Sequence, residues 1–276
     1  IPSGHDPNKY VVERIKAKSH DGRMIPISLV KLKNSKQDGK SKILLYAYGA
    51  YKHSVSPSFS ASRFCLVDRG ITFAIAHIRG GGDLGDSWHT EGKMKLKKNT
   101  FHDYIACANH LIDQRYTHQG GLCFYGGSAG GLTGGSVANM APELFFAMLL
   151  LVPFVDTMTT MLNEKLPLTP AEWELWGNPI KSKEHFDYIL SYSPYNNLSK
   201  KKYPPMLITS SIFDNRVLYS EPVKYIAKLR DVKDDDNKQL LKCKMDAAGH
   251  GGMSGRDNAI KELAEEYSFI LKNAKI

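Results

Sequence analysis

Short apolar runs of strand length alternate along the chain with longer stretches that have a helical pattern. The runs are mostly unalternating, which is typical of strands buried on both faces of a sheet. The expected strands are Ile27–Leu32, Ile43–Tyr48, Thr72–His77, Leu122–Tyr125, Leu149–Val152, Met206–Ser210 and Leu240–Met245. The expected helices are Asn99–Asp113, Ala129–Met140, Ser220–Arg230 and Arg256–Lys272. This alternation predicts an α/β fold with a mainly parallel sheet wrapped by helices.

Length and composition favour one large domain over residues 1–276, of which 42% are hydrophobic and 24% charged. Between Asp156 and Pro205 the regular alternation of expected strands and helices is interrupted, and we interpret this stretch as an insertion over the sheet. No apolar run approaches the roughly 18 residues of a membrane span. The polar start is unlike a secretory signal, and because it lacks Met we expect the chain to be cut from something longer.

The formal net charge of +9 raises the question of an anionic partner. The lysines are scattered, apart from short clusters at 93–98 and 200–202, and no nucleic-acid motif accompanies them. We therefore expect a solvated lysine-rich surface with neither nucleic acid nor membrane as partner. The charge could also belong to a face that contacts a missing part of the protein.

Four cysteines, Cys65, Cys107, Cys123 and Cys243, are widely spread without a C-x-x-C pair. Each lies in a largely apolar stretch, which predicts buried free thiols in a reducing compartment such as the cytoplasm. A disulfide is the alternative. No spacing typical of a metal site or of a phosphate-binding loop occurs, so we expect no metal and no cofactor.

A candidate nucleophile, Ser128, lies in the segment Gly-Gly-Ser-Ala-Gly at 126–130, which fits the pattern G-x-S-x-G. The expected strand Leu122–Tyr125 leads into it and the expected helix Ala129–Met140 leaves it, as this motif requires. The Ala129 N–H at the start of that helix would face a developing oxyanion. The alternative is a glycine-rich turn that only packs closely.

A serine nucleophile needs a base, and the base needs an orienting acid. In this strand–turn–helix arrangement the chain order is serine, acid, histidine. Asp214 follows the strand Met206–Ser210, and His250 follows the strand Leu240–Met245 within a glycine-flanked loop. We therefore predict that Ser128, Asp214 and His250 form a catalytic triad.

A second donor to the oxyanion should come from the loop after Ile43–Tyr48. That loop reads Tyr-Gly-Ala-Tyr from Tyr48 and lacks the H-G-G-G form of lipases. The phenolic O–H of Tyr48 could donate instead. From spacing alone, Tyr48 could equally be an aromatic residue that ends the strand.

Several motifs together resemble the prolyl oligopeptidase family, and within it the oligopeptidase B (protease II) group. They are Tyr48–Tyr51, the His-Ile-Arg-Gly-Gly-Gly-Asp-Leu-Gly segment at 77–85, Lys97–Phe101, Gly126–Gly131, Trp176–Pro179, Tyr192–Tyr195 and Asp214–Val217. The match runs from about residue 10 to the end of the chain. The resemblance implies an α/β-hydrolase catalytic domain that cleaves short peptides.

The resemblance also implies roles for individual residues. Ser128, Asp214 and His250 would be the triad, and Tyr48 would join the Ala129 N–H in the oxyanion hole. Arg216 would bind a substrate backbone carbonyl, a task that suits its planar donor fork. A salt bridge between Arg216 and a neighbouring acid is the alternative.

Two glutamates, Glu172 and Glu174, lie where oligopeptidase B-like sequences carry acids that accept an Arg or Lys side chain before the cleaved bond. A carboxylate flanked by Trp173 and Trp176 in a partly desolvated pocket would pair bidentately with a guanidinium. Prolyl-specific relatives have an apolar slot instead. The alternative is two surface glutamates on a helix turn.

The chain departs from these relatives in two places. Where they often carry two aspartates for a second basic side chain, this chain has Ser56-Pro57-Ser58, which predicts a weaker preference for paired basic residues. The family's β-propeller has no counterpart here, because no repeated four-stranded blades occur. We expect the full-length protein to carry it.

The resulting hypothesis is a serine oligopeptidase that hydrolyses short, basic peptides after Arg or Lys through an acyl-enzyme. A prolyl-specific oligopeptidase or an esterase with the same triad is the first alternative. A catalytically silent relative that serves as a binding module is the second.

Overall fold

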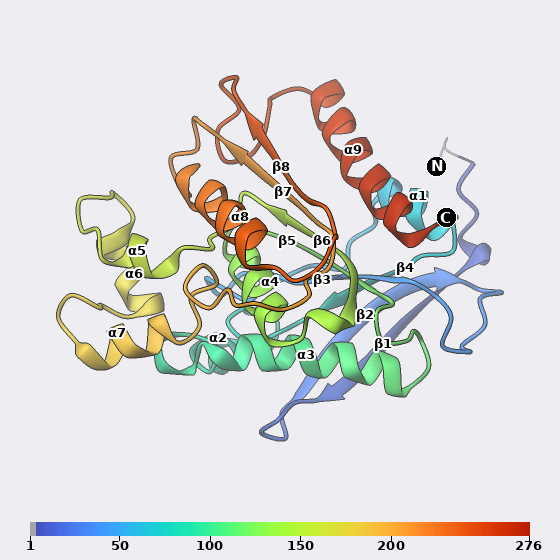
Figure 1. Cartoon of the computed structure of the whole chain (residues 1–276). Coiled ribbons are helices and arrows are strands. Elements are labelled where there is room, and N and C mark those ends of the chain that lie inside the picture. Colours follow the sequence, from blue (N-terminus) through green and yellow to red (C-terminus); the bar gives the residue numbers. More distant parts are fainter. Residues whose placement is uncertain (1–3) are drawn as a thin grey trace.

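The computed structural model describes residues 4–276 and contains an eight-stranded sheet in the order β1-β2-β4-β3-β5-β6-β7-β8 (Figure 1). β1 pairs antiparallel with β2 and β2 with β4, whereas all other neighbours are parallel. The expected mainly parallel sheet is therefore confirmed. The strands are β1 (Tyr10–Lys18), β2 (Met24–Leu32), β3 (Ile43–Tyr46), β4 (Thr72–Ala76), β5 (Leu122–Gly127), β6 (Phe145–Leu151), β7 (Met206–Ser211) and β8 (Gln239–Lys244).

β1 lies at one edge of the sheet and is not among the strands predicted from the sequence. Its charged residues, among them Glu13 and Lys16, interrupt the apolar run by which a buried strand is recognised. Charged side chains are common on edge strands, where they discourage pairing with another chain. The local pattern of β1 therefore reflects its exposed position.

Helices cover both faces of the sheet and extend beyond one end of it (Figure 1). The four expected helices are present, and the predicted insertion consists of three short helices, α5, α6 and α7. No helix within residues 4–276 is long and apolar enough to cross a bilayer. The helices are α1 (Ala61–Val67), α2 (Asp86–Thr90), α3 (Lys98–Asp113), α4 (Ala129–Met140), α5 (Thr157–Met161), α6 (Thr169–Trp176), α7 (Lys183–Leu190), α8 (Ser220–Val232) and α9 (Arg256–Ala274).

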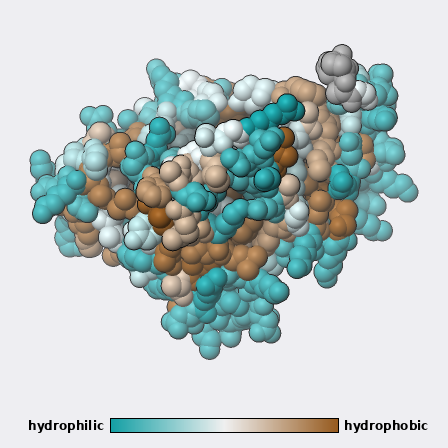
Figure 2. Space-filling model, turned by 90° about the horizontal axis from the view of Figure 1, so that it is seen from above, coloured by the Kyte–Doolittle hydropathy of each residue, from teal (hydrophilic) through white to brown (hydrophobic). Residues whose placement is uncertain are grey.

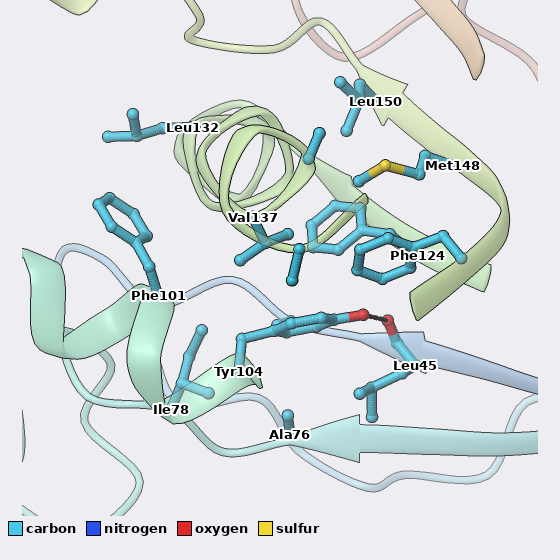
Figure 3. Packing of buried hydrophobic residues seen from close by; sticks show 14 of the residues in the cluster. Leu45, Ala76, Ile78, Phe101, Tyr104, Phe124, Leu132, Val137, Met148 and Leu150 are labelled. Atoms are coloured by element: carbon cyan, nitrogen blue, oxygen red, sulfur yellow. Dashed lines mark hydrogen bonds between the residues drawn. The ribbon is translucent and has the colours of Figure 1, made fainter. Parts of the chain in front are cut away.

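Two buried apolar clusters lie on opposite faces of the sheet. In β3, Ile43 and Leu45 belong to the larger cluster and Leu44 to the smaller one, because successive strand side chains point to opposite faces. In the larger cluster, Tyr104 of α3 packs near Phe124 of β5 and donates a hydrogen bond of 3.1 Å to the Leu45 carbonyl (Figure 3). The unalternating apolar strands thus reflect a sheet covered on both sides.

The four cysteines are free, but they are not all buried. Cys107 and Cys123 lie in the core, and burial raises the pKa of both thiols. Cys65 on α1 is exposed and Cys243 on β8 is partly exposed. The expectation of four buried thiols was therefore wrong for Cys65, because an apolar stretch on a surface helix still leaves one side facing solvent.

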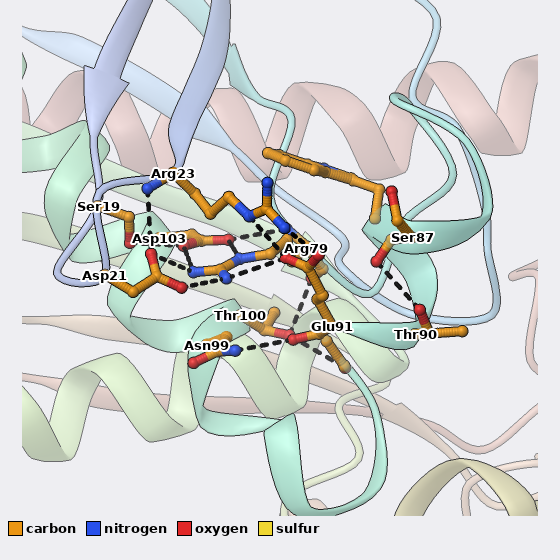
Figure 4. Close-up of polar contacts among 12 residues, drawn as sticks. Ser19, Asp21, Arg23, Arg79, Ser87, Thr90, Glu91, Asn99, Thr100 and Asp103 are labelled. Carbon is orange, nitrogen blue, oxygen red and sulfur yellow. Dashed lines mark hydrogen bonds and ion pairs between the residues drawn. The ribbon is translucent and has the colours of Figure 1, made fainter.

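A buried ion-pair network anchors the segment that follows β4 (Figure 4). Arg79 is 1% exposed and donates to both carboxylate oxygens of Asp103 at 2.8 and 2.7 Å. It also donates to Asp21 at 2.5 and 3.2 Å. Next to it, a Cβ on Gly80 would lie 2.2 Å from the Gly49 carbonyl oxygen. The network therefore holds a glycine run against the loop that carries Tyr48.

Replacing Arg79 with Met should lower the free energy of unfolding by about 3–5 kcal/mol, because Asp103 would remain buried without its cation. Urea denaturation measures this change. As a control, Arg23→Met removes an exposed ion pair with Glu91 and should cost no more than about 1 kcal/mol. Equal effects of the two substitutions would contradict the importance assigned to the buried pair.

Candidate active site

The predicted site residues gather at the carboxyl ends of neighbouring parallel strands. Tyr48 follows β3, Ser128 follows β5, Asp214 follows β7 and His250 follows β8. In open α/β sheets, ligands bind in the crevice outside these strand ends. Residues far apart in the sequence are brought to one edge of the sheet in this way.

Ser128 occupies a sharp turn between β5 and α4. Its φ of 54° and ψ of −123° are rare for a residue with a side chain. The Ser128 N–H donates to the Leu151 carbonyl at 2.8 Å, which fixes the turn against β6. A Cβ on Gly126 or Gly130 would lie 2.9 Å from the Ala47 carbonyl oxygen. The glycines of the motif are therefore required by this close approach.

Asp214 and His250 are hydrogen-bonded, with 2.7 Å between Asp214 Oδ2 and His250 Nδ1. The other Asp214 oxygen accepts the backbone N–H groups of Arg216 and Val217 at 2.9 and 3.0 Å. Burial opposes ionisation of Asp214, but the bonds from His250 and the two N–H groups outweigh it and lower its pKa. This arrangement orients the imidazole and leaves its Nε2 available.

The third member of the predicted triad is not yet hydrogen-bonded to the base. In the described part of the chain, no hydrogen bond joins Ser128 to His250. Such contacts are often long in unliganded sites and tighten when substrate binds. The structure thus brings Asp214 and His250 into contact and places Ser128 after β5, at the same end of the parallel strands.

Tyr48 and Ala129 line one cavity with Ser128. Burial raises the pKa of Tyr48, while a hydrogen bond with Ser128 lowers it, and the net effect is upward. The phenol therefore stays protonated and able to donate. Ala129 is the first residue of α4, so its N–H has no acceptor within the helix. Both groups can donate to an oxygen near Ser128.

The cavity has a volume of about 860 Å³ and lies between the strand ends and the α5–α6 insertion. Arg216 lines it, is exposed, and forms no ion pair with any acid in residues 4–276. The salt bridge considered for Arg216 is therefore not observed. Within the same residues, no cluster of acidic, histidine or cysteine side chains could hold a metal ion.

Only one of the two predicted specificity glutamates lines the cavity. Glu172 is partly buried, and its carboxylate accepts the Tyr51 hydroxyl and the Trp176 indole N–H, each at 2.9 Å. Glu174 is exposed and does not line the cavity. Positions two residues apart on α6 are rotated by about 200° around the helix axis, so the two glutamate side chains face opposite sides of the helix. Glu174 thus does not share the cavity of Glu172 in this structure, and its predicted role in binding a basic side chain stays a prediction.

A family model described as the prolyl oligopeptidase family matches residues 57–276. The chain belongs to the prolyl oligopeptidase family. Its curated relatives include dipeptidyl aminopeptidase BI of Pseudoxanthomonas mexicana, 46% identical over 97% of this chain and 37% of the relative. Protease 2 of Moraxella lacunata is 47% identical over 98% of this chain and 39% of the relative.

Solved structures of this family superimpose closely on the chain. Oligopeptidase B from Leishmania major has a TM-score of 0.96 and 43% identity, and the match covers 99% of this chain and 38% of that one. The expected α/β-hydrolase fold and the family resemblance are thereby confirmed. The chain spans less than two fifths of the length of these relatives.

Lys97 lies in one of the motifs noted above, but the sequence alone assigns it no role. It is fully buried, donates 2.6 Å to the Gly49 carbonyl, and lies 5.2 Å over the Trp176 ring. Burial lowers its pKa to about 7. Lys97 thus joins the loop after Tyr48 to the helix of Glu172. The Lys97–Phe101 motif was the available signal, but only the fold reveals these partners.

A second hydrogen-bonded Ser-His-Asp set occurs elsewhere in the chain, and it shows that these hydrogen bonds alone do not make a serine a nucleophile. His77 lies 2.9 Å from the Ser28 hydroxyl and 2.7 Å from Asp83. Ser28, however, is in the middle of β2, 7% exposed, and its oxygen also accepts from Arg14. It lies outside the cavity of Ser128. We interpret this set as structural.

Proposed function

We propose that this chain is the catalytic part of a serine peptidase that hydrolyses short peptides after Arg or Lys. The observation that carries the proposal is the presence of Ser128 and the Glu172 carboxylate in one cavity. Glu172 has no cationic partner within residues 4–276. The names of the relatives, Protease 2 and oligopeptidase B, support a peptidase.

The proposed mechanism is acyl transfer. His250 takes the proton of the Ser128 hydroxyl as its oxygen attacks the substrate carbonyl carbon. The resulting oxyanion accepts hydrogen bonds from the Tyr48 O–H and the Ala129 N–H. The His250 imidazolium then protonates the leaving amine, and the ester formed on Ser128 is hydrolysed by water with the same base. Asp214 stabilises the imidazolium, since its lowered pKa keeps it ionised.

Recognition of the substrate is assigned to Glu172 and Arg216. The Tyr51 and Trp176 donors fix the Glu172 carboxylate in one orientation, so little rotamer entropy remains to be lost on binding. Arg216, exposed and unpaired by any described acid, can donate to a backbone carbonyl of the peptide. An apolar slot for proline would instead lack a carboxylate at this position.

Glu172→Gln should lower kcat/KM for Arg substrates by about 10- to 100-fold, because it removes the charge and keeps the shape. Initial rates on matched Arg, Pro and simple ester substrates measure this effect. Glu174→Gln is the matched control and should change the rate less than about twofold. The prolyl and esterase alternatives predict that Pro or ester substrates outperform Arg substrates in the unmodified protein.

A second basic residue in the substrate, next to the Arg at the cleaved bond, should raise kcat/KM only slightly. The loop Ser56-Pro57-Ser58 supplies no carboxylate for a second basic side chain, and it does not line the cavity of Ser128. The second Arg of the substrate would find no carboxylate in this loop, and its attraction to acids farther away is screened by salt. Arg-Arg and Gly-Arg amides should therefore differ in kcat/KM by less than about threefold. A large preference for the Arg-Arg amide would contradict this assignment.

A further domain is proposed to cover the cavity in the longer protein, as the β-propeller of the family would. Apolar side chains gather into patches on the surface shown in Figure 2. Leu168 and Leu218 line the cavity and are exposed. Phe213, in the turn between β7 and Arg216, is 55% exposed. Exposed apolar groups of this kind often mark an interface.

A further inference from the structure

A second acidic side chain lines the cavity from the start of α8. Glu221 is 4% exposed and lies in the cavity wall with Ser128 and Glu172. Its Oε1 accepts the Thr160 hydroxyl at 2.6 Å, and its Oε2 accepts the Asp156 backbone N–H at 3.0 Å. These donors hold the carboxylate in a fixed orientation and leave acceptor capacity on both oxygens.

No cation within residues 4–276 is paired with this carboxylate. Lys224, one turn along α8, lies 2.5 Å from Asp156 and is therefore engaged by another acid. Arg216 lines the same cavity without forming an ion pair. A buried carboxylate without a cation is unfavourable, and a cation that enters from outside relieves this cost. The cavity thus presents two carboxylates of fixed orientation, Glu172 and Glu221, to an incoming group.

We propose that Glu221 is a specificity-determining residue that binds the basic side chain of the substrate together with Glu172. This inference rests on the proposed function, since it concerns the same cavity and the same substrate class. A guanidinium has five N–H donors and can bond two carboxylates at once. Glu221 thus supplies the second acid that the sequence analysis assigned to Glu174.

Binding of a basic side chain by Glu221 should depend on pH. Burial raises the pKa of Glu221 to about 7, although hydrogen bonds from the Thr160 hydroxyl and the Asp156 backbone N–H lower it; the Asp156 charge raises it further. Asp156 after β6 and Lys224 on α8 lie next to Glu221, and the other charged or titratable groups of the cavity wall include Lys52, His53, Glu172 and Arg216. The carboxyl becomes charged as pH rises through this range, so binding of a basic side chain should strengthen from about pH 6 to 8.

The test uses binding to a Ser128→Ala protein, which does not depend on turnover. Two peptides are compared by calorimetry, one ending in arginine amide and one ending in citrulline amide, a neutral analogue of similar shape. Adding Glu221→Gln should weaken binding of the arginine peptide about tenfold and change the citrulline peptide less than about twofold. Glu174→Gln is the matched control and should change neither.

Equal weakening of both peptides by Glu221→Gln would assign Glu221 a merely structural role and overturn the proposal. With Glu221 intact, the preference for arginine over citrulline should rise between pH 6 and 8, and a flat preference would also overturn it. This second readout needs no variant at Glu221. A protein that prefers arginine through Glu221 but hydrolyses no peptide would contradict the proposed function alone.

Discussion

Ser128→Ala is expected to lower kcat/KM for an Arg-containing amide by about 10⁴-fold or more, because no other group can form the acyl-enzyme. Binding of the same peptide should change little, since the hydroxyl is small and Glu172 and Arg216 remain in the cavity wall. Initial rates and calorimetric binding on one preparation separate the two effects.

The matched control is Ser28→Ala, which removes the serine of the second Ser-His-Asp set. Its kcat should stay within about threefold of the unmodified value, because Ser28 lies in β2 outside the cavity. A large loss in Ser28→Ala with retained activity in Ser128→Ala would exchange the roles of the two serines and remove the basis of the mechanism.

Tyr48→Phe is expected to lower kcat by about 10²- to 10³-fold with a small change in KM, because the lost hydrogen bond forms to the oxyanion of the transition state. Steady-state kinetics with an Arg amide measure both constants. Tyr46→Phe is a suitable control, since Tyr46 also borders the cavity but lies within β3. Its kcat should fall less than about threefold.

The Tyr48 phenol also has a defined pH behaviour. Its folded pKa lies above its ordinary value near 10, so the hydroxyl remains a donor throughout the neutral and moderately alkaline range. The activity of the unmodified protein should therefore show no decline attributable to Tyr48 below about pH 10. A loss of activity near pH 8 that is absent in Tyr48→Phe would show that the phenol ionises too early to serve as a donor.

The sequence predicted best those elements that are marked by a pattern of residues close together in the chain. The helix Ala129–Met140 was placed with its observed bounds, because Ser128 and its glycines define where a strand must end and a helix begin. The strands of the parallel region were found because both of their faces are buried. β1 lacked this signal, since its pattern reflects an edge.

The parts that could not be predicted depend on contacts between distant segments. Glu172 and Glu174 look equivalent in the sequence, and only the rotation of α6 separates them. Lys97 and Glu221 lie 75 and 49 residues from Glu172, so nothing local indicates that they share its surroundings. Chain order indicated Asp214 and His250, but their contact required the fold.

Mapping the site of covalent modification by a fluorophosphonate is the most direct test that Ser128 is the activated nucleophile. After proteolysis and mass spectrometry, the adduct should lie on the Ser128 peptide alone. Labelling should be absent in Ser128→Ala and slowed by about 10³-fold or more in His250→Ala, because the base activates the hydroxyl. An adduct on Ser28 or another serine, or undiminished labelling without His250, would contradict the account.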